Sequence, residues 1–405
     1  MIRIEAELLI PGRGEPVTPG TVILDGSRIV YAGPRNGAPS TPGADVAEVA
    51  TVLPGLWECH GHFIGATTPD LERIVTTPPA TLVATATADV AATLTGGVTS
   101  VREVGGFGID MHPAIATGTI PGPTIHGAGA LLSTTGGHGD IHGLPLDFVL
   151  SLGERGMRFT ELCDGVPECL RAVRRQLRRN AKVIKICASG GVMSEVDHPI
   201  HQQFSGDELR AIVAEARRAE RVVAAHCHGK PGIMAALEAG VTTIEHGSYL
   251  DEEAADLMLA TGAILVPTRL VVAQLLTMED TLPRYAYEKG VMIADRHEQA
   301  LKLAIAKGIP IAMGTDIFVS GPLYGTNSLE IRLLQDAGMT ALEAIEAATA
   351  NGPATLGPQA PRSGILGEGY DADVIAVDFD PLSDASPWGD PDRVTHVWKA
   401  GARAK

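Results

Sequence analysis

The sequence predicts a (β/α)₈ barrel joined to a small β-sandwich domain that is built from both ends of the chain. Short apolar strand-like segments alternate with helical patterns through the middle of the chain, and histidine, lysine and aspartate side chains mark the ends of several of those strands. Short strands punctuated by Gly and Pro are concentrated at both ends. We therefore expect a discontinuous β domain of residues 1–54 and 358–405, with a barrel of residues 55–357 inserted between its two parts.

Eight candidate strands account for the barrel. Their ranges are 55–62, 98–104, 123–127, 182–189, 222–226, 242–246, 263–267 and 311–315. Helical patterns are expected at 80–94, 167–180, 207–220, 231–238, 252–260, 285–307 and 341–350. Two of these helices begin with S/T-x-x-E capping boxes, at Ser205/Glu208 and Thr340/Glu343. The aperiodic stretch 129–165 is expected to be an active-site loop, because a loop of that length is rarely neutral.

Composition excludes several classes of partner and location. The 405-residue chain is 45% hydrophobic but only 4% aromatic, so its core must consist mainly of Ala, Val, Leu and Ile. A formal net charge of −16 disfavours nucleic acid and anionic membranes as partners. The five cysteines include no C-x-x-C pair, which argues against a disulfide framework or a zinc ribbon. No secretory signal and no membrane span of roughly 18 apolar residues is present, so we expect a cytoplasmic protein that acts on a small molecule.

Side chains that can bind metal ions stand at the ends of the predicted strands. His60 and His62 close the first strand, and residues two apart on a strand share a face, so both imidazoles can reach one ion. His226, His246 and Asp316 end later strands. Because the carboxyl ends of barrel strands meet at one face, we expect these side chains to converge there. Histidines combined with carboxylate oxygens suit Zn²⁺ or a similar divalent ion.

Lys185 allows two interpretations. It lies in an otherwise apolar strand, Val183–Cys187, where a buried ammonium is costly unless it is paired or neutralised. Its head can extend to the barrel rim. Alternatively, the deprotonated amine can react with CO₂ to form a carbamate, whose carboxylate bridges two cations. Beside so many histidines, the second interpretation is favoured.

These motifs resemble the metal-dependent amidohydrolase superfamily over nearly the whole chain. Residues 54–62, P-G-L-W-E-C-H-G-H, resemble the first-strand motif P-G-L-x-D-x-H-x-H, with Glu58 where the motif usually has Asp. Residues 185–194 resemble the carbamylated-lysine strand of the branch that contains prolidase-like dipeptidases, carboxypeptidase-like enzymes and ochratoxinase-like amidases. Residues 364–374 resemble the closing motif G-x-L-x-x-G-x-x-A-D. Residues 322–325, P-L-Y-G, depart from the His-Gly often found in relatives.

The resemblance implies a site for two divalent ions, most simply Zn²⁺. Its ligands in chain order are His60, His62, Lys185 as a CO₂-derived carbamate, His226, His246 and Asp316. Asp316 is also the expected proton shuttle. His138 and His228 match positions that face the substrate in this branch. If the substrate carries a carboxylate, a cation or phenol must meet it, and the candidates that follow strand ends are Tyr249, Arg269 and Tyr324.

The reaction so implied is cleavage of the amide bond of a dipeptide or N-acyl amino acid by a metal-bridging hydroxide. The alternative is a deaminase or cyclic-amide (imidazolone-like) hydrolase of the same superfamily. Deaminases of the superfamily usually use one metal and lack a bridging lysine, so Lys185 argues against this alternative. A non-catalytic binding protein on a degenerate barrel is more distant, because all six ligand positions are filled. Relatives suggest that the protein is a homo-oligomer.

Overall fold

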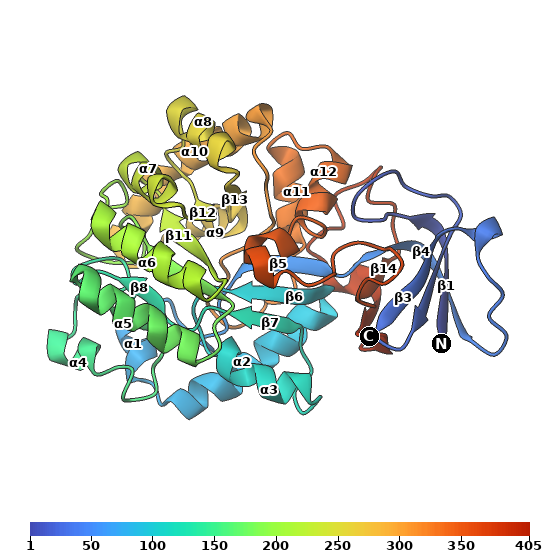
Figure 1. Ribbon diagram of the computed structural model, residues 1–405, viewed down its shortest axis with the longest axis horizontal. Coiled ribbons are helices and arrows are strands. Elements are labelled where there is room, and N and C mark those ends of the chain that lie inside the picture. Colours follow the sequence, from blue (N-terminus) through green and yellow to red (C-terminus); the bar gives the residue numbers. More distant parts are fainter.

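The computed structural model describes residues 1–405 and places a barrel of parallel strands, surrounded by helices, beside a smaller β unit (Figure 1). One parallel sheet of the barrel contains β5 (Leu56–Gly61), β6 (Val98–Glu103) and β7 (Thr124–Gly127). A second parallel sheet has the order β13-β12-β11-β10-β8-β9, formed by β8 (Leu131–Ser133), β9 (Thr160–Leu162), β10 (Val183–Cys187), β11 (Val222–Cys227), β12 (Thr243–His246) and β13 (Ile264–Val266). Most of these strands are buried on both faces, as their continuous apolar runs predict.

Backbone hydrogen bonds join the two sheets on both sides. The amide of Lys182 donates to the carbonyl of Gly127 at 2.9 Å, which connects the start of β10 to the end of β7. On the other side, the amides of Leu265 and Cys59 donate to carbonyls in the segment 310–316, at 2.9 and 2.8 Å. Together with β5–β7 and β10–β13, this segment completes a ring of eight strand-like elements in the predicted order.

The eighth predicted strand, 311–315, is extended but not a regular strand. It makes one parallel bridge, between Ile311 and Leu265. The amide of Met313 donates to the carbonyl of Ala347 rather than to a neighbouring strand. A regular ladder does not form because the groups of this short segment are divided among three neighbours.

The stretch 129–165 is more ordered than the sequence predicts. It contains β8, the helix α4 (Leu146–Leu150) and β9. β8 pairs in parallel with β10 through Leu132 and Ile186, and β9 pairs with β8. These two short strands extend the second sheet beyond the ring, and the pattern missed them because each has only three residues.

All seven predicted helices are present with small shifts of their ends, and the barrel has four further helices that the pattern did not predict. The predicted helices are α2 (Pro79–Thr95), α5 (Gly165–Arg178), α6 (Gly206–Arg218), α7 (Lys230–Ala239), α8 (Glu252–Thr261), α10 (Arg284–Lys307) and α12 (Ala341–Ala347). The further helices are α1 (Leu71–Thr76), α3 (Gly108–Ala116), α9 (Arg269–Leu275) and α11 (Leu329–Asp336). Both capping boxes are confirmed, at the starts of α6 and α12. No helix combines the length and apolarity needed to cross a bilayer.

The two ends of the chain form one seven-stranded sheet, with the order β16-β15-β14-β4-β1-β2-β3. Its strands are β1 (Ile2–Leu9), β2 (Gly20–Asp25), β3 (Arg28–Pro34), β4 (Asp45–Pro54), β14 (Val374–Val377), β15 (Val394–Lys399) and β16 (Ala402–Arg403). Both termini lie at this sheet in Figure 1, with the first strand β1 near its middle and the last strand β16 at one edge. A separate cluster of buried apolar side chains, including Ile4, Val22 and Trp398, packs within it. The boundaries at 54/55 and 357/358 stay a prediction.

Candidate metal centre

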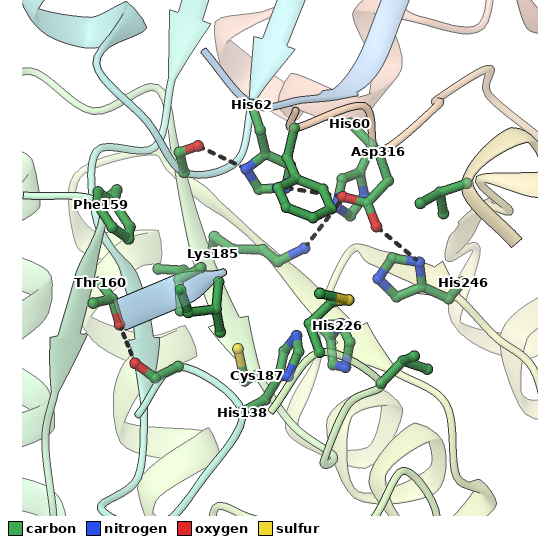
Figure 2. Close-up of a pocket in the computed structure, with 18 of the residues that line it drawn as sticks. His60, His62, His138, Phe159, Thr160, Lys185, Cys187, His226, His246 and Asp316 are labelled. Carbon is green, nitrogen blue, oxygen red and sulfur yellow. Dashed lines mark hydrogen bonds and ion pairs between the residues drawn. The ribbon is translucent and has the colours of Figure 1, made fainter. Parts of the chain in front are cut away.

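The side chains predicted to bind metal converge at one end of the barrel. His60 and His62 come from the end of β5, and Lys185 projects from β10. The others follow or end β11, β12 and the segment 310–316, and they are His226, His246 and Asp316. Figure 2 shows all six around one space. This is the carboxyl end of the parallel strands, where barrel active sites lie.

The first half of the site is formed by two histidines, a lysine and an aspartate. Nε2 of His62 lies 3.2 Å from Oδ1 of Asp316, and Nε2 of His60 lies 3.7 Å from the same oxygen. Nζ of Lys185 is 3.2 Å from Nε2 of His60. Burial would raise the pKa of Asp316, but His60, His62 and Lys185 outweigh it and lower the pKa to about 2. Asp316 is therefore an ionised carboxylate at neutral pH, able to bind a cation or accept a proton.

A charged network inside the barrel orients His60. Nδ1 of His60 lies 2.7 Å from Oε2 of Glu245, and Nη2 of Arg102 donates to the same oxygen at 2.6 Å. Both Arg102 and Glu245 are 0% exposed. Burial would raise the pKa of Glu245, but Arg102 and His60 outweigh it and lower the pKa. Because an ionised carboxylate only accepts, Nδ1 of His60 carries the proton and Nε2 is left to bind metal.

Backbone carbonyls determine which nitrogen carries the proton in two more imidazoles. Nδ1 of His62 donates to the carbonyl of Gly105 at 2.6 Å, so Nε2, the nitrogen next to Asp316, is unprotonated in the neutral ring. Nε2 of His226 donates a hydrogen bond to the carbonyl of Gly190 at 3.1 Å. The other nitrogen, Nδ1, is then unprotonated in the neutral ring and can bind a metal ion. Each ring therefore has one anchored nitrogen and one nitrogen available as a ligand.

The second half of the site is a cluster of three buried histidines. Nitrogen atoms of His226, His228 and His246 all lie within 4.8 Å of one another. Burial lowers the pKa of His228 to about 3, and lowers the pKa of His226 and His246 well below the usual value. All three rings are neutral at pH 7, the form in which imidazole binds metal. Nδ1 of His246 also lies 4.0 Å from Oδ2 of Asp316, which connects this half to the first.

Lys185 is a buried amine without a counter-ion. The residue is 2% exposed, its Nζ has only His60 as a hydrogen-bond partner, and it forms no ion pair. Burial lowers its pKa and outweighs the opposite effect of Glu245. A neutral amine is nucleophilic, and it is the form that reacts with CO₂. The head of Lys185 points into the site beside His60 and does not extend to the rim.

Strained backbone marks the same place. His246, Asp316 and Thr268 have left-handed φ values of 66°, 59° and 54°, which non-glycine residues seldom adopt. Nδ1 of His246 lies 2.7 Å from Oγ1 of Thr268, so two strained residues hold each other. Such conformations cost of order 1–3 kcal/mol each and persist at functional sites where the surroundings impose them.

An apolar cavity opens onto the metal ligands. His138 and His228, the residues expected to face the substrate, both line it. The apolar part of its wall is Ile64, Leu71, Leu131, Ile141, Phe159, Val192, Met193, Val271, Val272, Leu275, Ile293 and Phe318. Apart from Lys185, no lysine or arginine lines the cavity. The wall therefore suits an apolar group, and a polar or ionised group must meet the histidines or a bound cation.

The three residues predicted to meet a substrate carboxylate lie outside this wall. Nη2 of Arg269 donates to Oε2 of Glu298 at 3.0 Å. The hydroxyl of Tyr324 is buried and donates to the carbonyl of His62, so it supports the strand end from behind. Tyr249 packs against an apolar cluster that includes Leu275 and Ile293. The side chains predicted as metal ligands lie together at the strand ends, whereas these three longer side chains find partners away from the cavity.

Sequence reasoning missed the residues that orient the ligands. Glu245 and Arg102 carried a signal, since each is a charged residue in a strand that is otherwise buried, and one directly precedes His246. Glu58, which stands where the resembling motif has Asp, accepts from the amides of His60 and Thr315 at 2.8 and 3.0 Å. It therefore ties β5 to the segment 310–316 and is not itself a candidate ligand. The carbonyls of Gly105 and Gly190 carry no sequence signal.

Comparison with known proteins gives a consistent result. The model of the amidohydrolase family matches residues 51–403. Ochratoxinase from Aspergillus niger is 44% identical over 98% of this chain and 85% of that protein. The crystal structure of A. niger ochratoxinase superposes with a TM-score of 0.94 at 43% identity, covering 99% of this chain and 95% of that one.

Two solved peptidases are similar over the same length. A prolidase complexed with N-methylphosphonate-L-proline gives a TM-score of 0.91 at 31% identity and covers 99% of this chain and 98% of its own. A Xaa-Pro dipeptidase with methionine bound in the active site gives 0.89 at 31%, with 99% of each chain covered. These relatives share the whole architecture, including the sheet formed by the two ends of the chain.

Proposed function

The chain belongs to the amidohydrolase family and is a hydrolase of amide bonds, and from that premise we propose that it uses two metal ions to cleave a dipeptide or N-acyl amino acid. The observation that carries the proposal is the convergence of six ligand-type side chains, from five separate elements, at the carboxyl end of the barrel. Lys185 lies beside His60 of the first half and has no ion-pair partner of its own.

The donor set fits two divalent ions. His60, His62 and Asp316 present two nitrogens and a carboxylate oxygen to one place, and His226 and His246 present two nitrogens to another. A carbamate on Lys185 would supply oxygens to both ions and would remove an unpaired amine from a buried site. Nitrogen and oxygen donors of this kind suit Zn²⁺.

The protein's own groups have distinct roles in the reaction. Bound divalent ions would polarise a carbonyl and lower the pKa of a water toward neutrality. Asp316, ionised at neutral pH, is placed to accept the proton of the attacking water and to pass it to the leaving nitrogen. His138 and His228 line the cavity and are placed to contact the carbonyl side of the substrate. A positioned proton shuttle contributes roughly 10²–10⁴-fold.

The cavity narrows the class of substrate. Its wall is apolar, with Phe159 and Phe318 among its members, so we infer that one side of the scissile amide carries a bulky apolar group. The names of the relatives supply probes that fit this description in part: ochratoxin from the ochratoxinase, and Xaa-Pro dipeptides from the prolidase and the dipeptidase. We propose amides that carry a bulky apolar group as substrates, ahead of small polar dipeptides.

The test combines a hydrolysis screen with metal analysis. Zn²⁺-loaded protein is assayed against ochratoxin, Xaa-Pro dipeptides and N-acyl amino acids of increasing apolar size, while bound metal is counted per chain. We expect about two ions per chain, and loss of metal in Lys185→Ala. The matched control is Lys182→Ala, since Lys182 lies three residues earlier and its ammonium bonds only to the side chain of Asn180. One ion per chain, unaffected by Lys185→Ala, would instead favour the deaminase-like alternative, and no hydrolysis of any probe would reject the proposal.

A further inference from the structure

A chain of polar groups runs from His138 in the cavity to the helix α10. Nδ1 of His138 lies 2.9 Å from Oγ of Ser194, and Oγ of Ser194 hydrogen-bonds to Oδ1 of Asp197. Oδ1 of Asp197 lies 3.4 Å from Nζ of Lys289 in α10. Ser194 is 1% exposed, and the side chains of Asp197 and Lys289 are 5% and 13% exposed. None of these three residues lines the metal site itself, and the proposed reaction does not use them.

The surrounding donors fix the charge of Asp197. Its Oδ2 accepts from the amide of Gly191 at 2.9 Å and from Nε2 of Gln203 at 3.0 Å. Its Oδ1 accepts from Ser194 and faces Lys289. Three of these groups, the two N–H donors and the ammonium of Lys289, can only donate, and a cation beside a carboxyl group favours its ionised form. Burial would raise the pKa of Asp197, but His138, Ser194 and Lys289 outweigh it and lower the pKa.

The direction of each hydrogen bond then follows. A carboxylate has no proton to give, so the hydroxyl of Ser194 donates to Asp197. Ser194 has only that one proton, so its oxygen must accept from His138. Nδ1 of His138 therefore carries a proton, and Nε2 is the nitrogen left for the cavity. His138 therefore owes its Nδ1–H tautomer to the hydroxyl of Ser194, whose own direction is set by the carboxylate of Asp197.

Packing around the chain leaves little freedom for other arrangements. A Cβ on Gly191 would lie 2.1 Å from Nδ1 of His138, so the ring packs directly on that backbone. Gln203 binds both ends of the network: its Oε1 accepts from the amide of His138 at 3.1 Å, while its Nε2 donates to Asp197. Lys289 also donates to the carbonyl of Ser194 at 2.7 Å, which holds the loop against α10. The ring of His138 stacks on His226, with centroids 4.2 Å apart.

We propose that Ser194, Asp197 and Lys289 are positioning residues that hold His138 as its Nδ1–H tautomer and present Nε2 to the amide substrate. The effect of this tautomer on catalysis rests on the proposed amide hydrolysis, but the assignment of the tautomer does not depend on that proposal. Polar partners that fix a histidine in this way are worth about 10–100-fold in activity where they have been removed.

Two substitutions separate the tautomer from simple packing. Ser194→Ala removes the acceptor of the Nδ1 proton and leaves the tautomer unspecified. Asp197→Asn should reverse the direction of the hydrogen bonds between residue 197, Ser194 and His138. The amide oxygen of Asn takes the place of Oδ2, where two donors converge, so its NH₂ group faces Ser194. Ser194 must then donate toward His138, which requires the Nε2–H tautomer. Ser194→Thr keeps the hydroxyl, and Val196→Ala, at an exposed position of the same loop, is the matched control.

Nitrogen-15 NMR of histidine-labelled, Zn²⁺-loaded protein reports the tautomer directly. The ring-nitrogen signals of His138 are assigned as those that disappear in His138→Asn. We expect Nδ1–H in the wild type, Ser194→Thr and Val196→Ala, a mixture in Ser194→Ala, and Nε2–H in Asp197→Asn. An Nε2–H tautomer in the wild type would overturn the proposal without any variant. This readout stands even if every substrate probe fails, so it distinguishes this inference from the proposed function.

Steady-state kinetics on the substrate found by the screen test the consequence. We expect kcat to fall about 10–100-fold in Ser194→Ala and in Asp197→Asn, with a much smaller change in KM and with bound metal unchanged. Ser194→Thr should recover most of the loss. Equal kcat in Ser194→Ala and the wild type, or a loss that Ser194→Thr fails to recover, would show that these residues only support the loop.

Discussion

Each half of the metal site has one histidine held by a backbone carbonyl, and the halves differ in the side chain that holds a second histidine. On the first half, His60 is anchored by Glu245 and Arg102, both fully buried in strands of the barrel. On the second half, His246 is anchored by the hydroxyl of Thr268, which lies in the turn between β13 and α9. A charged network inside the barrel is coupled to folding, whereas a neutral partner on a turn is coupled mainly to local geometry. The first half should therefore be the more sensitive to substitution.

The largest effect is expected for Arg102→Met. The substitution leaves the carboxylate of Glu245 buried without its cation, a loss that costs about 3–5 kcal/mol of unfolding free energy. Guanidinium unfolding of metal-free protein measures it. Arg178→Met, at an exposed position of α5 without a side-chain partner, is the matched control and should change stability by less than about 0.5 kcal/mol.

The double variant Arg102→Met/Glu245→Gln sharpens this result. If the cost comes from an unpaired charge, neutralising Glu245 as well should recover part of it, and the two losses will not add. Strict additivity would mean that Arg102 stabilises the barrel by packing alone.

Glu245→Gln should weaken metal binding on the first half about 10–100-fold. An amide can turn its NH₂ toward His60, and Nδ1 would then become the acceptor and Nε2 the protonated nitrogen. Chelator competition resolves two classes of ion, and only the one held by His60 and His62 should weaken. Equal weakening of both ions would mean that the two halves are not independently anchored.

The sequence predicted which side chains converge at the strand ends because their signal is local, and their role as metal ligands stays a prediction. A histidine or aspartate at the end of an apolar strand can be recognised without knowing the neighbouring strand, and His60, His62, His226, His246 and Asp316 all have this signature. The alternation of strands and helices fixed the barrel in the same way. Even the irregular segment 310–316 was recognised by its apolar run, although its hydrogen bonds go to three neighbours.

The groups that anchor the site histidines were not predicted, because they depend on contacts between distant parts of the chain. The pairing of Glu245 with Arg102 joins residues 143 apart, and the anchoring of His62 uses a carbonyl, which every residue possesses. Arg269 and Tyr324 were predicted from position alone, and long side chains at a strand end can turn toward many partners. Sequence patterns therefore predict which residues reach the site but not which residues hold them there.

The second half should contribute to the pH dependence of stability. In metal-free protein, burial lowers the pKa of His228 to about 3 and lowers the pKa of His226 and His246 well below the unfolded value of about 6.5. The unfolded chain then binds more protons than the folded one below that pH, so stability falls as pH falls, by up to about 1.4 kcal/mol per pH unit for each histidine.

Removing one of these histidines tests the assignment. Between pH 6.5 and about 4.5, the slope of stability against pH should decrease in His228→Asn, because one proton-binding difference is lost. His201→Asn, at an exposed position outside the cluster, is the matched substitution for comparison. An unchanged slope in His228→Asn would mean that other buried histidines, and not this cluster, set the acid limit.

The smallest effect is expected at Thr268. Thr268→Ala removes the hydroxyl next to Nδ1 of His246, while Thr268→Ser keeps it, and both remove the same methyl group. One neutral hydrogen bond contributes about 1 kcal/mol, so the ion on the second half should bind about 5-fold more weakly in the alanine variant than in the serine variant. Chelator competition measures the difference, and a loss as large as that of Glu245→Gln would remove the distinction between a half held by buried charges and a half held by a turn.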